Sequence, residues 1–142
     1  MDNNSKSLLA ISFGAGFVAP NIPIATFHQG DKELNFILDT GSDDNVVDKE
    51  ILQNTQHEPV EHEGKLYGAG EGLDVDACMI TFQYEGETFT EKFLISDCMK
   101  KTFDAIRGCH CIQLHGLLGS KFLRNNNFVL DYNKLQAYNN KE

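Results

Sequence analysis

One carboxylate in this 142-residue chain, that of Asp39, is placed where it could do chemistry. Residues 34–38 carry large apolar side chains at every second position, a pattern that predicts a β-strand. The strand runs directly into Asp39-Thr40-Gly41-Ser42. Loops at strand ends often carry function, and a carboxylate held there can act as a general acid or base. The alternative is an ordinary turn, because Asp, Thr, Gly and Ser all favour turns.

Two further motifs follow along the chain. Tyr67-Gly68-Ala69-Gly70 lies between polar strand patterns, and its glycines permit the positive φ angles of a sharp hairpin tip. The alternative for this motif is a plain surface hairpin. Leu117-Leu118-Gly119 precedes a short segment that Ser120 can cap as a helix through Asn125. A strand pattern then returns at residues 129–132.

In this order the three motifs resemble those of the retropepsin family of aspartic peptidases, over roughly residues 20–138. The resemblance implies that Asp39 is catalytic and that Thr40, Gly41 and Ser42 support its loop. It also implies that residues 67–70 form a flap over the substrate and that residues 117–119 pack beneath the loop. The chain has a single Asp-Thr-Gly, whereas the chemistry needs two carboxylates that share one proton. The resemblance therefore implies a homodimer, with one Asp39 from each subunit.

The implied reaction is peptide-bond hydrolysis by acid–base activation of water, and it requires no cofactor or metal. The ionised Asp39 takes a proton from water, and the protonated Asp39 of the second subunit polarises the peptide carbonyl. By the same resemblance, the Thr40 hydroxyl bonds to the partner's loop. We expect the Ser42 hydroxyl to donate to the outer carboxylate oxygen of Asp39. The alternative function is a catalytically silent module of the same fold for dimerisation or peptide binding, because fold alone does not fix function.

Further acidic residues lie beside the Asp39 loop, in addition to the pair of catalytic carboxylates that the resemblance implies. Asp43 and Asp44 follow Ser42 directly, so a dimer gathers several carboxylates near one cleft, and like charges disfavour ionisation. Asp97 and Asp131 also end apolar strand patterns, but neither precedes Thr-Gly or Ser-Gly, and both are interpreted as structural turn residues.

The resemblance implies that the partners are a second copy of the chain and a peptide or protein substrate, whereas composition only excludes a class of partner. The net charge of −9 and the pI near 4.9 argue against nucleic acid, whose binders carry basic patches. Residues 8–19 are apolar, but the residues before them are not basic and the stretch is too short to span a membrane. We interpret it as a first strand, which favours a cytoplasmic protein with no membrane contact. A secreted protein with a signal peptide is the alternative.

The four cysteines are expected to be thiols in such a compartment: Cys78, Cys98, Cys109 and Cys111. An even number also suits disulfides, if the chain is secreted. Cys109-His110-Cys111 with His115 nearby suggests zinc, but the spacing does not match the usual paired arms of a zinc site. We therefore expect no metal.

The predicted fold is all-β: a closed, pepsin-like or retropepsin-like barrel with one or two short helices. An N-terminal extension over residues 1–19 precedes a single domain over residues 20–142. Turn residues predict hairpins at 29–31, 85–87 and 133–134, and Asp48 can cap a brief helix through Leu52. Residues 53–63 are expected to be loop, and residues 97–113 irregular.

Overall fold

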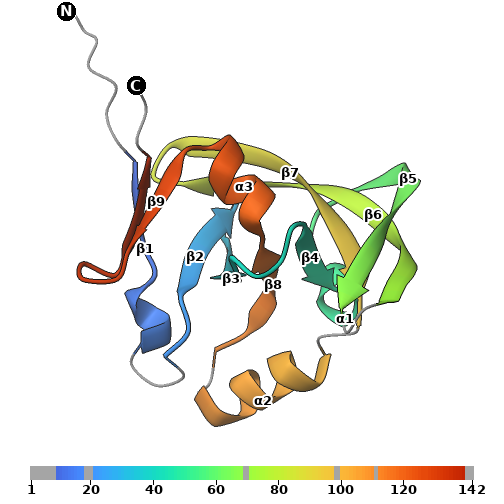
Figure 1. The fold of residues 1–142 in the computed structure, drawn as a ribbon, viewed down its shortest axis with the longest axis horizontal. Coiled ribbons are helices and arrows are strands. Elements are labelled where there is room, and N and C mark those ends of the chain that lie inside the picture. Colours follow the sequence, from blue (N-terminus) through green and yellow to red (C-terminus); the bar gives the residue numbers. More distant parts are fainter. Residues whose placement is uncertain (1–8, 18–20, 69–70, 98–99, 111, 140–142) are drawn as a thin grey trace, which may run out of the picture.

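The computed structural model describes residues 9–17, 21–68, 71–97, 100–110 and 112–139 (Figure 1). Strands dominate these residues: β1 (Ala10–Ser12), β2 (Ile24–Gln29), β3 (Lys32–Leu38), β4 (Asn45–Asp48), β5 (Glu58–Gly68), β6 (Glu71–Tyr84), β7 (Glu87–Ser96), β8 (Leu114–Leu118), β9 (Phe128–Asp131) and β10 (Gln136–Asn139). The helical elements are short: the 3₁₀ helix η1 (Gly14–Phe17), α1 (Lys49–Leu52), α2 (Lys100–His110) and α3 (Ser120–Asn125). No helix within these ranges is long and apolar enough to cross a membrane.

The main sheet closes into a barrel. Its order across the described strands is β2-β3-β8-β4-β7-β6-β5, and β2 also pairs with β6 through His28 and Gln83. This extra pairing joins the first six strands into a closed barrel, with β5 added outside as the partner of β6. The prediction of an all-β closed barrel is confirmed, although the described residues contain α1, α2, α3 and η1 where one or two short helices were predicted.

A second, smaller sheet joins the two ends of the described chain. Its order is β1-β10-β9, with all pairings antiparallel and Ile11 opposite Ala137. The Ser12 amide donates to the Tyr84 hydroxyl at 3.0 Å, which ties this sheet to the barrel. A strand therefore lies within residues 8–19, and its partner is the C-terminal strand of the same chain.

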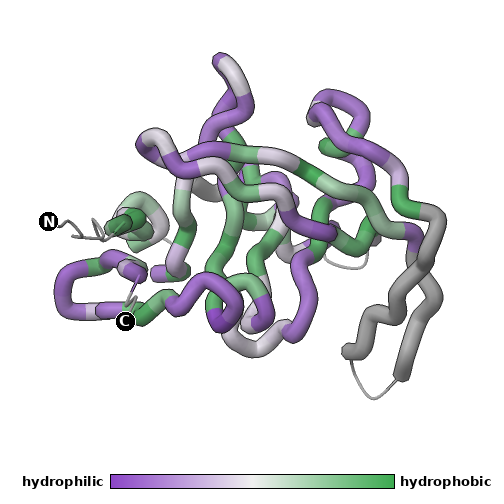
Figure 2. Tube along the Cα trace, turned by 90° about the horizontal axis from the view of Figure 1, so that it is seen from above, coloured by the Kyte–Doolittle hydropathy of each residue, from purple (hydrophilic) through white to green (hydrophobic). Residues whose placement is uncertain are grey.

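The barrel interior is filled by phenylalanine. Edge-on contacts connect the rings from strand to strand, for example between Phe27 and Phe82, whose centroids lie 4.9 Å apart. Such pairs add to the stabilisation that burial alone provides. Figure 2 shows the same division, with hydrophobic positions along the barrel strands and hydrophilic positions at the outer turns. The fully buried phenylalanines are Phe13, Phe27, Phe36, Phe82, Phe93, Phe103 and Phe122.

Several local predictions are confirmed and others are wrong. The Asp48 side chain caps α1 by accepting the Glu50 amide proton, and the Asp131 side chain accepts two amide protons in the β9–β10 turn, as expected. Residues 53–63 are not all loop, because β5 begins at Glu58. The N-cap of α3 is Gly119, which provides no side-chain cap, so the predicted capping role of Ser120 is wrong.

The largest difference from the sequence prediction is α2, which lies in the stretch 97–113 that was expected to be irregular. Its Phe103 and Ile106 are buried against apolar side chains of β2, β3, β4 and β8, so the helix covers an outer face of the barrel (Figure 1). Cys109 and His110 lie in its last turn, and Cys111 lies outside the described residues. Cys98 lies outside them as well, whereas Cys78 is a free thiol inside the core, where burial raises its pKa to about 11.

Candidate active site

The loop that carries Asp39 connects β3 and β4, which are not paired with each other in the sheet. β8 lies between β3 and β4, parallel to β3 and antiparallel to β4. The Asp39 amide continues the β3–β8 ladder by donating to the Leu118 carbonyl at 2.9 Å. The chain then turns through residues 39–44 and enters β4 on the far side of β8. Both ends of the loop are therefore fixed by the same strand.

The Asp39 carboxylate is held by its own loop. Its Oδ1 accepts the Gly41 amide proton at 2.9 Å, and the Ser42 amide donates to the Asp39 carbonyl at 3.2 Å. A Cβ at position 41 would lie 3.3 Å from the same Oδ1, so glycine permits this close approach. The Asp39 side chain is half-buried, and Thr40 beside it is exposed. A carboxylate that is anchored through one oxygen and reachable by solvent can exchange protons with a bound water.

Residues 117–119 lie directly against this loop. A Cβ on Gly119 would lie 2.5 Å from the Asp44 carbonyl oxygen and 2.6 Å from that of Ser42, so only glycine fits. Two amides at the start of α3 donate to loop carbonyls: Ser120 to Ser42 at 2.6 Å and Lys121 to Asp43 at 3.1 Å. The loop therefore rests on the junction between β8 and α3.

The hydroxyl of Ser42 has a different partner from the one predicted. It donates to the Asp44 carbonyl oxygen at 2.8 Å. A hydroxyl has one proton to donate, so the predicted bond from Ser42 to the Asp39 carboxylate is wrong for this arrangement. Ser42 stabilises the return of the loop and not the charge of the carboxylate.

One of the two extra acidic groups is neutralised. Lys121 on α3 forms an ion pair with Asp44, at 2.9 Å between Nζ and Oδ1, and this contact raises the pKa of Lys121. Asp43 is exposed on the same loop. The negative charge that accompanies Asp39 is thus smaller than the sequence alone implied.

The motif at residues 67–70 lies at the end of a long hairpin. β5 and β6 pair up to Gly68 and Glu71, so only residues 69 and 70 separate the two strands. Pairing between β6 and β7 begins at Ala77, and the residues of β6 before it pair with β5 alone among the described strands. Ala69 and Gly70 themselves lie outside the described residues. Closure of this hairpin over a substrate stays a prediction.

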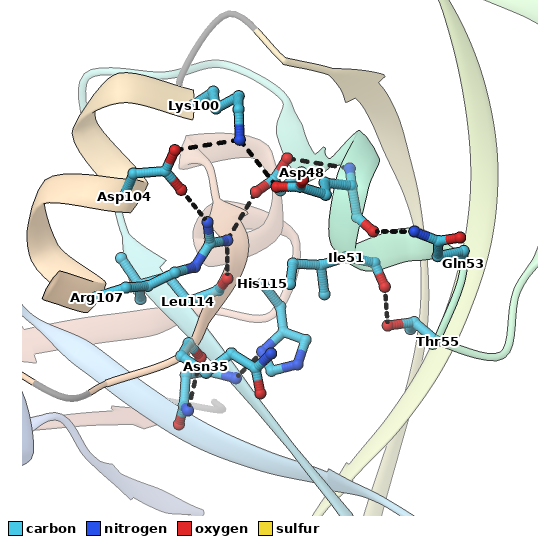
Figure 3. Close-up of polar contacts among 12 residues, drawn as sticks. Asn35, Asp48, Ile51, Gln53, Thr55, Lys100, Asp104, Arg107, Leu114 and His115 are labelled. Carbon is cyan, nitrogen blue, oxygen red and sulfur yellow. Dashed lines mark hydrogen bonds and ion pairs between the residues drawn. The ribbon is translucent and has the colours of Figure 1, made fainter.

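Buried polar groups near the loop were not predicted from the sequence. Asn45, 6% exposed, accepts the Gly119 amide proton through Oδ1 at 2.9 Å and donates through Nδ2 to the Lys92 carbonyl at 3.0 Å. Asp48, 1% exposed, pairs with Arg107 of α2 at 2.7 Å (Figure 3). The local sequence contains no signal for either contact, because each partner lies far away along the chain.

His115 is a third buried polar group, and it lies on β8 below the loop. Its Nδ1 accepts the Asn35 amide proton at 3.1 Å, which fixes a neutral imidazole (Figure 3). Burial, assisted by the nearby charge of Arg107, lowers the pKa of His115 to about 4. The side chain lines an open cavity of about 560 Å³, together with residues of β2, β3 and α1, and no residue of the 39–44 loop takes part in that lining. Within the described part of one chain, this cavity does not form a cleft around Asp39.

Comparison with known proteins gives a structural likeness only. No family model and no curated protein matches the sequence. Among solved structures, the chain is similar to EIAV protease complexed with the inhibitor HBY-793, with a TM-score of 0.51 and 17% identity. The match covers 75% of this chain and 89% of that protein. The chain therefore has a retropepsin-like fold.

Proposed function

We propose that this chain is an aspartic endopeptidase that acts as a homodimer. The observation that carries the proposal is the position of Asp39. Its half-buried carboxylate ends β3, is held by the Gly41 amide, and lies on a loop that Gly119 supports from below. The structural neighbour is a protease that was solved with an inhibitor, which supports the same class.

In the proposed dimer, the two Asp39 carboxylates face each other and share one proton, because like charges about 3 Å apart cannot both ionise. The ionised member accepts a proton from a water molecule, and that water attacks the peptide carbonyl. The protonated member donates to the carbonyl oxygen as negative charge develops there. The hairpins that end at residues 69–70 then cover the substrate and exclude bulk water.

The smaller sheet offers a surface for the second subunit. β9 is an edge strand of this sheet, and an unpaired strand edge is a template for pairing with another chain. Val129 on β9 is 36% exposed and Tyr132 beside it is 54% exposed; both are large apolar residues at the surface of the described chain. A symmetric contact here would use the same patch on both subunits.

The first experiment compares the wild type with Asp39→Asn on a library of peptides. Asp39→Asn keeps the size of the side chain and removes its ionisable group, so cleavage should fall by about 10³-fold or more. Asp97→Asn is the matched control, since Asp97 is exposed and follows strand β7 away from the loop, and it should cleave as the wild type does. Comparable cleavage by Asp39→Asn would refute the catalytic role.

A mixing experiment tests whether the site is shared. Equal amounts of wild type and Asp39→Asn are unfolded together and refolded, which scrambles the subunits. If each site needs Asp39 from both subunits, about one quarter of the activity of an equal total amount of wild type remains. If each subunit acts alone, about one half remains. A wild type that dimerises but cleaves no peptide would instead favour the silent binding module.

A further inference from the structure

The side chain of Asn45 connects three segments around the candidate catalytic loop. Asn45 follows the loop as the first residue of β4. Its Oδ1 accepts the amide proton of Gly119, the residue on which the loop rests, and its Nδ2 donates to the carbonyl of Lys92 on β7. One planar amide provides an acceptor and a donor at once. No apolar side chain of similar size can make both bonds.

The contact reaches Asp39 through a short series of backbone bonds. Gly119 follows Leu118, whose carbonyl accepts the Asp39 amide proton at 2.9 Å. A Cβ on Gly119 would overlap loop carbonyls, so the Gly119 backbone already lies against the loop. Any movement of Gly119 therefore moves both the base of the loop and the strand position beside Asp39.

We propose that Asn45 is a positioning residue for Asp39, acting through Gly119 and Leu118. The expected effect of Asn45 on kcat rests on the proposed peptidase function. The expected effect of Asn45 on the position of Gly119 and Leu118 rests on the structure alone. Asn45 lies near the loop exit and does not touch the Asp39 carboxylate. Its role is to keep the segment from Leu118 to Gly119 at a fixed distance from β7, so that the two loops of a dimer meet in register.

The kinetic test uses Asn45→Ala and Asn45→Asp. Asn45→Ala leaves the Gly119 amide and the Lys92 carbonyl without their partner, so the loop can shift. A displacement of about 1 Å can cost up to about 10²-fold in rate, so kcat should fall by about ten- to a hundred-fold while KM changes little. A raised KM with an unchanged kcat would overturn the proposal.

Asn45→Asp adds a signature that a merely structural role would not give. The introduced carboxylate still accepts the Gly119 proton, but its second oxygen faces the Lys92 carbonyl and repels it. The protonated carboxyl donates to that carbonyl and restores both bonds. Burial raises the pKa of such a carboxyl group. The ratio of kcat for Asn45→Asp to kcat for the wild type should therefore recover as the pH falls. A ratio that stays well below one at every pH down to the acid limit of folding would overturn the proposal.

Asn35→Asp is the matched control. Asn35 is also partly buried in the sheet: its Nδ2 donates to the Gln113 carbonyl at 2.9 Å and its Oδ1 accepts from the Thr26 hydroxyl at 2.6 Å. It lies four positions before Asp39 on β3, or about 13 Å along the strand. This variant should lose stability, but kcat per folded dimer should stay at the wild-type value. Equal losses of kcat in Asn45→Asp and Asn35→Asp would mean that the Asn45 side chain contributes to stability only.

A second readout works even if the protein cleaves nothing. Amide hydrogen exchange followed by NMR reports on the Gly119 and Asp39 amides directly. In Asn45→Ala, both amides should exchange faster relative to the global unfolding limit, whereas Asn35→Asp should leave them protected. Unchanged protection of the Gly119 and Asp39 amides from exchange in Asn45→Ala would refute the positioning role, whether or not the protein is a peptidase.

Discussion

Acidification should destabilise the folded chain through His115. This imidazole is 7% exposed, and its Nδ1 accepts the Asn35 amide proton, so it can be protonated only by breaking that bond. Burial is the main reason that its folded-state pKa falls to about 4, and the charges of Arg107 and Lys32 add to the effect. A backbone hydrogen bond at Gln113 and, to a smaller extent, the charge of Asp48 act in the opposite direction and do not cancel them.

The size of the effect follows from the two pKa values. In the unfolded chain the imidazole takes up a proton near its ordinary pKa of 6.5, whereas in the folded chain it does so only near 4. Between these values the unfolded state binds more protons, so the free energy of unfolding falls as the pH falls. The contribution of His115 is fully present above pH 6.5 and is lost progressively towards pH 4. Each pKa unit is worth about 1.36 kcal/mol, so the loss amounts to about 3 kcal/mol per subunit.

The assay is urea unfolding of the wild type and of His115→Asn at several pH values between 7 and 4, at one protein concentration. The asparagine amide can accept the same proton from Asn35 but does not titrate. The carboxylates of the protein titrate in both proteins, so they cancel in the difference. The wild type should lose about 3 kcal/mol more than His115→Asn over this range. His28→Asn, which removes an exposed imidazole, should behave as the wild type does. Parallel curves for the wild type and His115→Asn would refute the reasoning.

Two other substitutions test the loop. Gly119→Ala forces a Cβ to within 2.5 Å of the Asp44 carbonyl, so it should cost about 1–3 kcal/mol in urea unfolding and most of the activity. Gly108→Ala, on helix α2 with nothing within 4 Å of the new Cβ, should instead gain about 1 kcal/mol, and a loss there would show that the helix is packed differently. Ser42→Ala should leave the acidic limb of the pH–rate profile in place, because the hydroxyl donates to the Asp44 carbonyl. A shift of that limb towards neutral pH would mean that Ser42 serves the Asp39 carboxylate after all.

The features that the sequence predicted are those with local causes. The alternation of residues 34–38 specifies β3, and Glu85-Gly86 specifies a tight turn, since both residues adopt positive φ there. The capping of α1 by Asp48 depends on a residue two positions away. In each case the determining interaction lies within a few residues, so the sequence pattern predicts the local structure without knowledge of the fold.

The features that were missed depend on distant partners. Asn45 and Gly119 are separated by 74 positions, and Asn35 and His115 by 80. No local sequence pattern therefore predicts the hydrogen bond between the members of either pair. Helix α2 carries an apolar stripe of only a few residues, and packing of Phe103 and Ile106 on the barrel provides much of its stability. The predicted bond from the Ser42 hydroxyl to the Asp39 carboxylate is wrong because a serine hydroxyl readily bonds to a backbone group two residues away, here the Asp44 carbonyl.

The insertion of β8 between β3 and β4 has a consequence for biosynthesis. The loop at residues 39–44 is translated before the strand on which it rests, because that strand begins at Leu114, about 70 positions later. A nascent chain that has reached only the β6–β7 hairpin contains Asp39 but has neither the Leu118 carbonyl nor the Gly119 surface that fixes the loop. Such pairings between distant segments are slow to form, because the intervening chain must be closed first. The loop therefore stays without its support on the ribosome until β8 and the start of α3 have emerged, which delays the ordering of Asp39 until well after its own synthesis.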